Sequence, residues 1–204
     1  MKIATLATAL LSAAPTILGL TTGTANAATL VVEGDGILTG AKGVTIGNRI
    51  YDVEFREGTC AQVYGTCTKP SFAFEFMSDA QAAAAVLLDQ VFVDGPLGRF
   101  DSNPALTFGC ADTVCNTLIT YGNGGNLSFF AGVVANRDVD QDITMSTARA
   151  VQLNSASLPN YNFARFTFVG VVPEPETWAT MLVGFGMIGA TTRYRRKSRT
   201  GSFA

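Results

Sequence analysis

Apolar and polar residues alternate through much of the middle of the chain, a pattern typical of β-strands with one buried face. The clearest example is residues 44–56, where two such runs flank the pair Gly47-Asn48. In the second run Tyr51, Val53 and Phe55 fall on one face, and charged residues fall on the other. Because Gly-Asn between two strand-like runs is a turn signal, these residues predict a β-hairpin.

Three further segments carry strand patterns. Two of them alternate like the hairpin, at Phe72, Phe74 and Phe76 and again at Ala164, Phe166 and Phe168. The third, Leu127 to Val134, is a more continuously apolar run, which is typical of a central strand. Together these segments predict antiparallel sheets.

One helix is expected between the strands, in an alanine-rich stretch from Ala82 to Leu88. Ser78 and Gln81 predict a capping box at its start, and Gly95-Pro96 predicts that it ends near Phe92. An apolar stripe suited to packing on a sheet consists of Ala84, Leu87, Leu88 and Val91. The expected fold is therefore mainly β, antiparallel and sandwich-like, with one packed α-helix.

The first 27 residues have the three parts of a secretory signal peptide. Met1-Lys2 is a short positive start, Ile3 to Leu20 is an apolar run, and Ala25-Asn26-Ala27 is a small-residue cleavage site. An amino-terminal membrane anchor is the alternative, which Pro15 inside the apolar run disfavours. We therefore expect an exported chain that signal peptidase cleaves after Ala27.

A second apolar segment, Trp178 to Thr192, contains fifteen residues without a charge. As a helix it would be about 22 Å long, which is short for a hydrocarbon core of about 30 Å. A basic tail follows it and would stay on the cytoplasmic side of a membrane: Arg193, Arg195, Arg196, Lys197 and Arg199. These features predict a single transmembrane helix that holds the rest of the chain outside the cytoplasm.

The tripeptide Pro173-Glu174-Pro175 stands just before this segment and is followed by Trp178-Ala179. The tripeptide, the apolar segment and the basic tail, in this order, resemble the PEP-CTERM sorting signal of Gram-negative bacteria, in the variant with Trp-Ala. The resemblance implies recognition by an exosortase, removal of the tail and delivery to the cell surface or the extracellular polysaccharide matrix. An ordinary single-pass anchor is the alternative.

These signals divide the chain into a signal peptide (1–27), an extracytoplasmic β-rich domain (28–172) and a sorting signal (173–204). The domain carries eight Lys and Arg against fourteen Asp and Glu, a net charge of −6, which disfavours nucleic acid as a partner. The chain has no histidine, which excludes Ser-His-Asp triads and histidine-containing zinc sites.

The four cysteines form two close pairs, Cys60 with Cys67 and Cys110 with Cys115. In an exported protein an even number of cysteines favours disulfides, and four cysteines allow three pairings. We favour the local pairing. A four-thiolate metal site is the alternative, but neither pair has the C-x2-C spacing typical of zinc ribbons.

Acidic residues suggest two kinds of chemistry. Alternate carboxylates in an extended loop could attract Ca²⁺, and such a series is Asn136, Asp138, Asp140 and Asp142. The EF-hand pattern fails, because Ile143 and Arg149 stand where that loop needs Gly and Glu. A solvated acidic loop is the simpler interpretation, and we expect no metal and no cofactor.

The carboxylate pairs Glu33/Asp35 and Asp52/Glu54 are of the kind that a glycoside hydrolase uses, but we favour the interpretation that they are surface polar positions on hairpins. We therefore expect a non-catalytic surface or matrix protein associated with exopolysaccharide or biofilm. Its expected partners are the exosortase, signal peptidase, the membrane and exopolysaccharide. The alternatives are a carboxylate-based polysaccharide hydrolase and a permanently anchored periplasmic protein.

Overall fold

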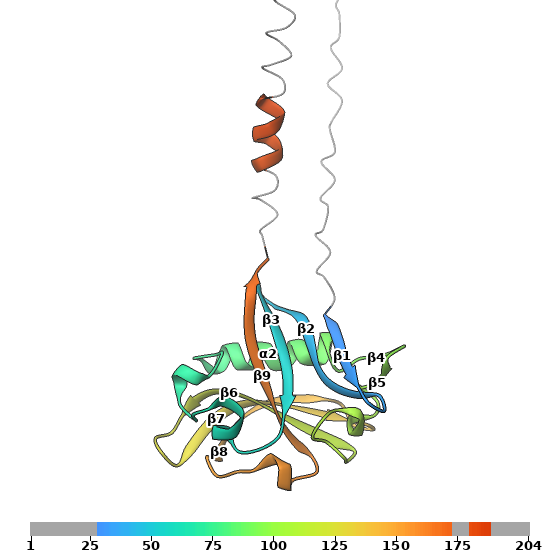
Figure 1. The fold of residues 1–204 in the computed structure, drawn as a ribbon, viewed down its shortest axis with the longest axis vertical. Coiled ribbons are helices and arrows are strands. Elements are labelled where there is room, and N and C mark those ends of the chain that lie inside the picture. Colours follow the sequence, from blue (N-terminus) through green and yellow to red (C-terminus); the bar gives the residue numbers. More distant parts are fainter. Residues whose placement is uncertain (1–27, 173–179, 189–204) are drawn as a thin grey trace, which may run out of the picture.

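The computed structural model describes residues 28–172 and 180–188. Seven strands of residues 28–172 form one sheet in the order β1-β2-β3-β9-β6-β7-β8 (Figure 1). Their bounds are β1 (Thr29–Glu33), β2 (Ile37–Ile46), β3 (Arg49–Arg56), β6 (Val114–Asn123), β7 (Ser128–Arg137), β8 (Ile143–Ala150) and β9 (Tyr161–Val171). Neighbouring strands are antiparallel except β6 and β9, which are parallel. The prediction of a mainly β fold is confirmed, and this seven-stranded sheet is mixed because of the parallel pair.

Shorter elements connect these strands. Two α-helices, α1 (Cys60–Tyr64) and α2 (Met77–Gln90), lie between β3 and the two-stranded ribbon of β4 (Asp94–Gly95) and β5 (Gly98–Arg99). The described residues also contain three short 3-10 helices, η1 (Lys69–Ser71), η2 (Pro104–Leu106) and η3 (Ser155–Ser157). The helix α2 contacts β2, β6, β7 and β8, so the sheet curves around it and the expected packed helix is confirmed.

The predicted hairpin is present as β2 and β3. The turn is Gly47-Asn48, and the backbone of Gly47 has a φ of 61°, which glycine adopts without strain. The exposed fractions of Tyr51, Val53 and Phe55 are 3%, 2% and 2%, so the predicted apolar face is the buried one. The alternation in this region was therefore a reliable guide to the fold.

The start of α2 differs from the prediction. The helix begins at Met77 with Phe76 at its cap position, and no side chain caps it, so the predicted Ser78 capping box is wrong. Gln81 instead donates through Nε2 to Ser146 Oγ on β8, at 3.1 Å. The Gln81 side chain, which the local pattern assigned to the cap, thus makes a tertiary contact with the sheet.

The predicted strand at residues 72–76 is also wrong. This segment runs irregularly between η1 and α2, and its aromatic rings are buried in different places. Phe72 joins the core cluster under α1, whereas Phe74 joins the cluster around α2; Phe76 is 62% exposed. The alternation therefore reflects a chain that crosses between two cores, with no sheet face involved.

The other two strand predictions are confirmed. The apolar run from Leu127 corresponds to β7, which is flanked by β6 and β8 and is therefore an interior strand. Ala164 and Phe166 are buried on β9, whereas Phe168 near the end of that strand is 56% exposed.

The predicted signal peptide and most of the predicted sorting signal, residues 173–179 and 189–204, lie outside the described residues. Residues 180–188 are helical, and their apolar side chains are exposed. Among residues 28–172 and 180–188, no helix has both the length and the apolar composition needed to cross a membrane.

Candidate functional site

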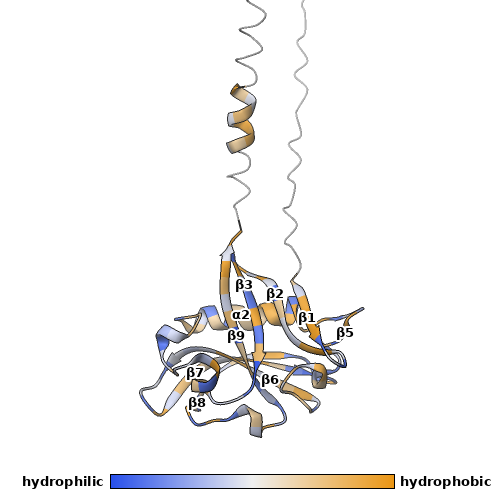
Figure 2. Ribbon diagram, viewed as in Figure 1, coloured by the Kyte–Doolittle hydropathy of each residue, from blue (hydrophilic) through white to orange (hydrophobic). Residues whose placement is uncertain are grey.

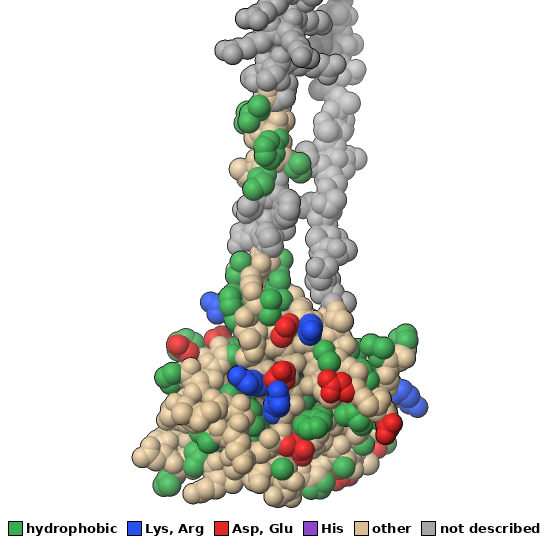
Figure 3. Space-filling view, viewed as in Figure 1, with side chains coloured by type: hydrophobic (Ala, Val, Ile, Leu, Met, Phe, Trp, Pro, Cys, Tyr) green, Lys and Arg blue, Asp and Glu red, His purple; other side chains and the backbone are tan. Residues whose placement is uncertain are grey.

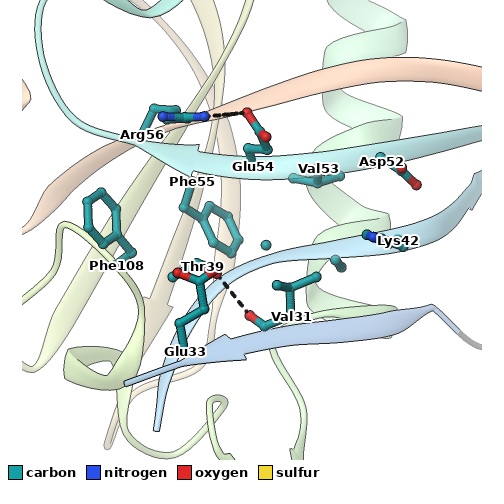
Figure 4. A pocket seen from close by; sticks show the side chains of 12 residues that line it. Val31, Glu33, Thr39, Lys42, Asp52, Val53, Glu54, Phe55, Arg56 and Phe108 are labelled. Atoms are coloured by element: carbon teal, nitrogen blue, oxygen red, sulfur yellow. Dashed lines mark hydrogen bonds and ion pairs between the residues drawn. The ribbon is translucent and has the colours of Figure 1, made fainter. Parts of the chain in front are cut away.

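A groove of about 310 Å³ crosses the outer face of β1, β2 and β3 (Figure 4). Side chains on the solvent side of these strands point into it, together with Phe108 from the loop after η2. Its polar lining consists of Glu33, Thr39, Lys42, Asp52, Glu54 and Arg56. The groove is therefore a charged depression on a sheet whose other face is the core.

Gly40 lies in the middle of this groove. It is paired with Val31 on β1 and with Glu54 on β3, so it occupies the central strand of the three. A Cβ atom at this position would lie 2.1 Å from the backbone oxygen of Val53, which is far inside contact distance. Glycine is therefore required here, and the missing side chain leaves room in the groove.

Asp52 has a structural contact inside the groove. Its carboxylate accepts a hydrogen bond from the backbone N–H of Gly43 at 3.1 Å. The register between β2 and β3 shifts between Ala41 and Val44, and Gly43 has a φ of 72°, which marks a β-bulge. Asp52 thus fastens the bulge to the neighbouring strand.

Glu54 forms an ion pair with Arg56, with Glu54 Oε2 and Arg56 Nη2 2.9 Å apart. Both side chains are about half exposed, so water screens the pair and it contributes little to stability. Both groups therefore stay accessible to a ligand that offers hydrogen-bond partners.

Phe108 stands at one end of the groove and is 37% exposed. Its backbone N–H donates to Leu38 O on β2 at 2.9 Å, and its carbonyl accepts from Asn162 Nδ2 on β9 at 2.6 Å. These bonds fix the loop against the sheet. The groove thereby combines an aromatic ring with charged donors and acceptors, a combination that can bind a hydroxyl-rich ligand.

The structure divides the predicted carboxylate pairs. Glu33, Asp52 and Glu54 come together at the groove, whereas Asp35 is exposed in the turn after β1 and does not line it. Sequence reasoning missed the groove because three strands build it. The signal that could have found it is a strand with charges at alternate positions next to a strand that contains glycine.

The acidic series after β7 does not form one cluster. Asn136 is fully buried on β7 and donates from Nδ2 to Phe100 O at 2.7 Å, whereas Asp138, Asp140 and Asp142 belong to the following loop. Asp142 accepts from the backbone N–H of Arg137 at 2.8 Å. Burial raises the pKa of Asp142, and the neighbouring Asp101 carboxylate adds to that rise. In the part of the chain that the structure describes, no set of three or more acidic, His or Cys residues is arranged to hold a metal ion.

Two disulfides join Cys60 to Cys67 and Cys110 to Cys115, the local pairing favoured above. The four sulfurs are therefore committed, and the four-thiolate metal alternative is wrong. Cys60 starts α1 and is buried in the core cluster beneath it, and Cys115 is buried on β6. Each disulfide thus ties a loop to a buried element.

Tyr64, at the end of α1, connects this helix to the sheet. Its hydroxyl donates to Ala164 O on β9 at 3.1 Å, and its ring packs edge-on against Phe72 and Phe163. Burial raises the pKa of Tyr64 to about 12, although the polar groups of Thr120 act in the opposite direction. The hydroxyl therefore holds α1 against β9 and stays protonated over a wide pH range.

The end of β9 leads into the predicted sorting signal. Val171 is the last residue of the strand, and the N–H of Val172 donates to Asn48 O at 2.8 Å. A comparison with protein-family models matches residues 171–197 to the PEP-CTERM protein-sorting motif. The chain carries a PEP-CTERM sorting motif. Among curated proteins and among solved structures, none matches the chain.

The PEP-CTERM match covers the residues quoted for the resemblance, from Pro173-Glu174-Pro175 and Trp178-Ala179 to the basic residues as far as Lys197; Arg199 lies beyond it. The PEP-CTERM motif implies an exported protein with membrane-associated sorting, and an exosortase as its processing partner. It begins at Val171, inside the last strand of the domain. No described spacer separates the sheet from the signal.

Proposed function

We propose that this protein is a non-catalytic component of the cell surface or extracellular matrix that associates with exopolysaccharide through the groove over β1, β2 and β3. The observation that carries the proposal is the PEP-CTERM motif at residues 171–197, since an exosortase substrate is delivered outward. In this proposal signal peptidase removes residues 1–27, and the tail beyond Pro173-Glu174-Pro175 is removed during sorting.

The groove supports the polysaccharide part of the proposal. A neutral or partly charged sugar chain offers many hydroxyl groups, which donate to carboxylates such as Glu33 and accept from Lys42 and Arg56. Residues from β1, β2 and β3 line the groove, so a bound sugar chain would contact all three strands. The overall negative charge of the domain disfavours nucleic acid as the polymer.

The intact mass of the protein recovered from the envelope and the medium of its native host tests the sorting part. We expect the mass to lack residues 1–27 and everything beyond the Pro173-Glu174-Pro175 region. A mass that retains the Arg-rich tail would contradict sorting and would support a permanently anchored periplasmic protein.

Binding to matrix polysaccharide from the producing cells tests the groove. We expect Arg56→Gln to weaken binding by about fivefold, which corresponds to the loss of about 1 kcal/mol from one hydrogen-bonded contact. The matched control is Lys69→Gln, which removes the same charge from an exposed position outside the groove. Equal affinities of the two variants would contradict the groove as the contact.

A carboxylate-based polysaccharide hydrolase is a second candidate, because Glu33, Asp52 and Glu54 line one groove. Glycoside hydrolysis needs one carboxyl group as the acid and another as base or nucleophile. Two of these three groups already serve Gly43 and Arg56, which favours binding over catalysis. Loss of polysaccharide chain length on incubation, abolished by Glu33→Gln or Glu54→Gln, would favour the hydrolase instead.

A further inference from the structure

The end of β9 exposes an apolar surface that the groove does not use. We call residues 168–172 the β9 tip. The exposed fractions of Phe168, Val169, Val171 and Val172 are 56%, 58%, 59% and 39%. Figure 2 shows this end of β9 in orange, and Figure 3 shows green side chains gathered where the described domain ends. A cluster of exposed apolar residues on a small domain marks an interaction surface.

At the β9 tip, of the described strands only β3 lies beside β9 in the sheet. β6 pairs with β9 only from Tyr161 to Phe163, whereas β3 follows β9 as far as Val171. A strand open to water normally alternates apolar and polar residues. The tip instead has valine at positions 169, 171 and 172, on both of its faces. The ring of Phe168 packs edge-on against Tyr51, but Val169 and Val171 leave more than half of their surface exposed.

The position of the tip identifies what covers it. Val172 is six residues before Trp178, and six residues of fully extended chain span at most about 20 Å. The described helix at residues 180–188 exposes apolar side chains suited to lipid: Met181, Leu182, Val183, Phe185 and Met187. If Trp178 lies at the membrane surface, Val172 is therefore within about 20 Å of the bilayer. The start of β1 lies at the same end of the domain as the tip (Figure 1).

We propose that the β9 tip lies in the interface of a phospholipid bilayer while the carboxyl-terminal tail is in the membrane, and so holds the domain against the membrane where an exosortase acts. This inference rests on the proposed function, since it takes the tail to enter the membrane. Arg49, opposite Val171 on β3, adds an exposed guanidinium that can contact lipid phosphates. The unflanked edge of β9 keeps its backbone groups near water, so the contact is interfacial and does not reach the hydrocarbon core.

Tryptophan fluorescence of the full chain in vesicles tests this proposal, because Trp178 is the only tryptophan. The vesicles contain phosphatidylethanolamine and phosphatidylglycerol with brominated acyl chains, which quench tryptophan at the bilayer. Wild type reports the position of the tail. The double variant Trp178→Phe with Val169→Trp reports the tip. The matched control is Trp178→Phe with Val139→Trp, since Val139 is an 88% exposed valine in the loop between β7 and β8.

We expect strong quenching of Trp178 and of the probe at position 169, several-fold above quenching of the probe at position 139. Quenching of Trp178 with equal, weak quenching at positions 169 and 139 would overturn the inference and leave the sorting proposal to its mass measurement. Absence of quenching at Trp178 would mean that the carboxyl-terminal tail does not enter the bilayer, and would overturn the inference because the inference assumes that it does. A blue shift at position 169 that follows protein concentration and ignores brominated lipid would assign the tip to a second copy of the chain, and would also overturn it.

Discussion

The strand pairs β2–β3 and β6–β7 belong to one sheet but use its faces differently. β6 and β7 lie between two cores: Ile119 and Val134 face the cluster around α2, and Leu118 and Val133 face the cluster under α1. The pair β2–β3 has one core face, and its other face carries the groove. The two strand pairs can therefore serve different purposes. Side chains between two cores can only stabilise the fold, whereas an open sheet face can also bind a ligand.

Each strand pair contains a glycine at a position where a Cβ atom would clash with the backbone of an adjacent element. On β2, a Cβ on Gly40 would lie 2.1 Å from Val53 O of the adjacent strand. On β7, a Cβ on Gly132 would lie 2.9 Å from Ala80 O of α2, so Gly132 allows the helix to approach the sheet closely. Substitutions at these two positions therefore test the two regions separately.

The largest effect is expected for Gly40→Ala. The new methyl group would push β2 away from β3, and we expect a loss of about 3 kcal/mol in the free energy of unfolding, together with loss of polysaccharide binding. Urea unfolding measures the first and a binding assay the second. Gly170→Ala is the matched control, because a Cβ there meets nothing within 4 Å. Equal stability of the two variants would contradict the steric argument.

Gly132→Ala should cost less, about 2 kcal/mol, because the overlap is smaller, with the new Cβ 2.9 Å from Ala80 O against 2.1 Å from Val53 O at position 40. Its effect on binding should be absent at temperatures where the variant remains folded, since Gly132 is remote from the groove lining. Urea unfolding and the same binding assay measure both quantities. Weaker binding by folded Gly132→Ala protein would remove the distinction between the two regions.

Tyr64→Phe removes the hydrogen bond to Ala164 O and should cost about 1 kcal/mol at pH 7. The raised pKa of Tyr64, about 12 against an ordinary value of 10, adds a pH dependence. Between pH 10 and about 12 the unfolded chain loses this proton while the folded chain keeps it, so wild-type stability falls as the pH rises. Thermal unfolding across this range should show a smaller fall for Tyr64→Phe, and identical slopes would contradict the assignment.

The smallest effects are expected at two aspartates whose pKa values move in opposite directions. The pKa of Asp94 is lowered, chiefly by hydrogen bonds from the backbone and side chain of Ser102, whereas burial raises that of Asp142. Asp94 therefore stabilises the fold above its ordinary pKa and loses this contribution in acid. For Asp142 the folded chain holds the proton more tightly than the unfolded chain. The free energy of unfolding therefore falls as the pH rises from the ordinary aspartate pKa through the raised pKa of Asp142.

Thermal unfolding as a function of pH checks both signs. Asp142→Asn should be as stable as wild type or more stable at pH 7, with its Oδ1 still accepting from Arg137 N–H. Asp94→Asn should be less stable than wild type at pH 7 and should approach it in strong acid. The same sign for both variants at pH 7 would contradict these assignments.

The sequence predicted the β2–β3 hairpin, β7, β9 and the packed helix, because each depends on a regular local pattern. It failed where tertiary contacts decide. Gln81 reaches β8 rather than the helix start, and a capping box forms at α1 through Thr59 and Gln62. Phe72 and Phe74 alternate but enter separate cores.

The candidate site was harder to predict than the sorting motif. Pro173-Glu174-Pro175 and its neighbours form a contiguous pattern, which can be recognised without a fold. The groove needs Glu33, Glu54 and Phe108 to come together from β1, β3 and a distant loop. The register of three strands decides which charges share a surface, and a single sequence does not specify that register.

The place of β9 in the sheet has a consequence for biosynthesis. Of the strands in the described residues, β9 is the last to be synthesised, yet it lies between β3 and β6 and joins β1–β3 to β6–β8. Its pairs with β3 close over more than one hundred residues, so they form slowly and late. A chain that stops before Tyr161 contains two unjoined sheets. The seven-stranded sheet is therefore complete only in a chain that extends to Val171, the residue at which the sorting motif begins.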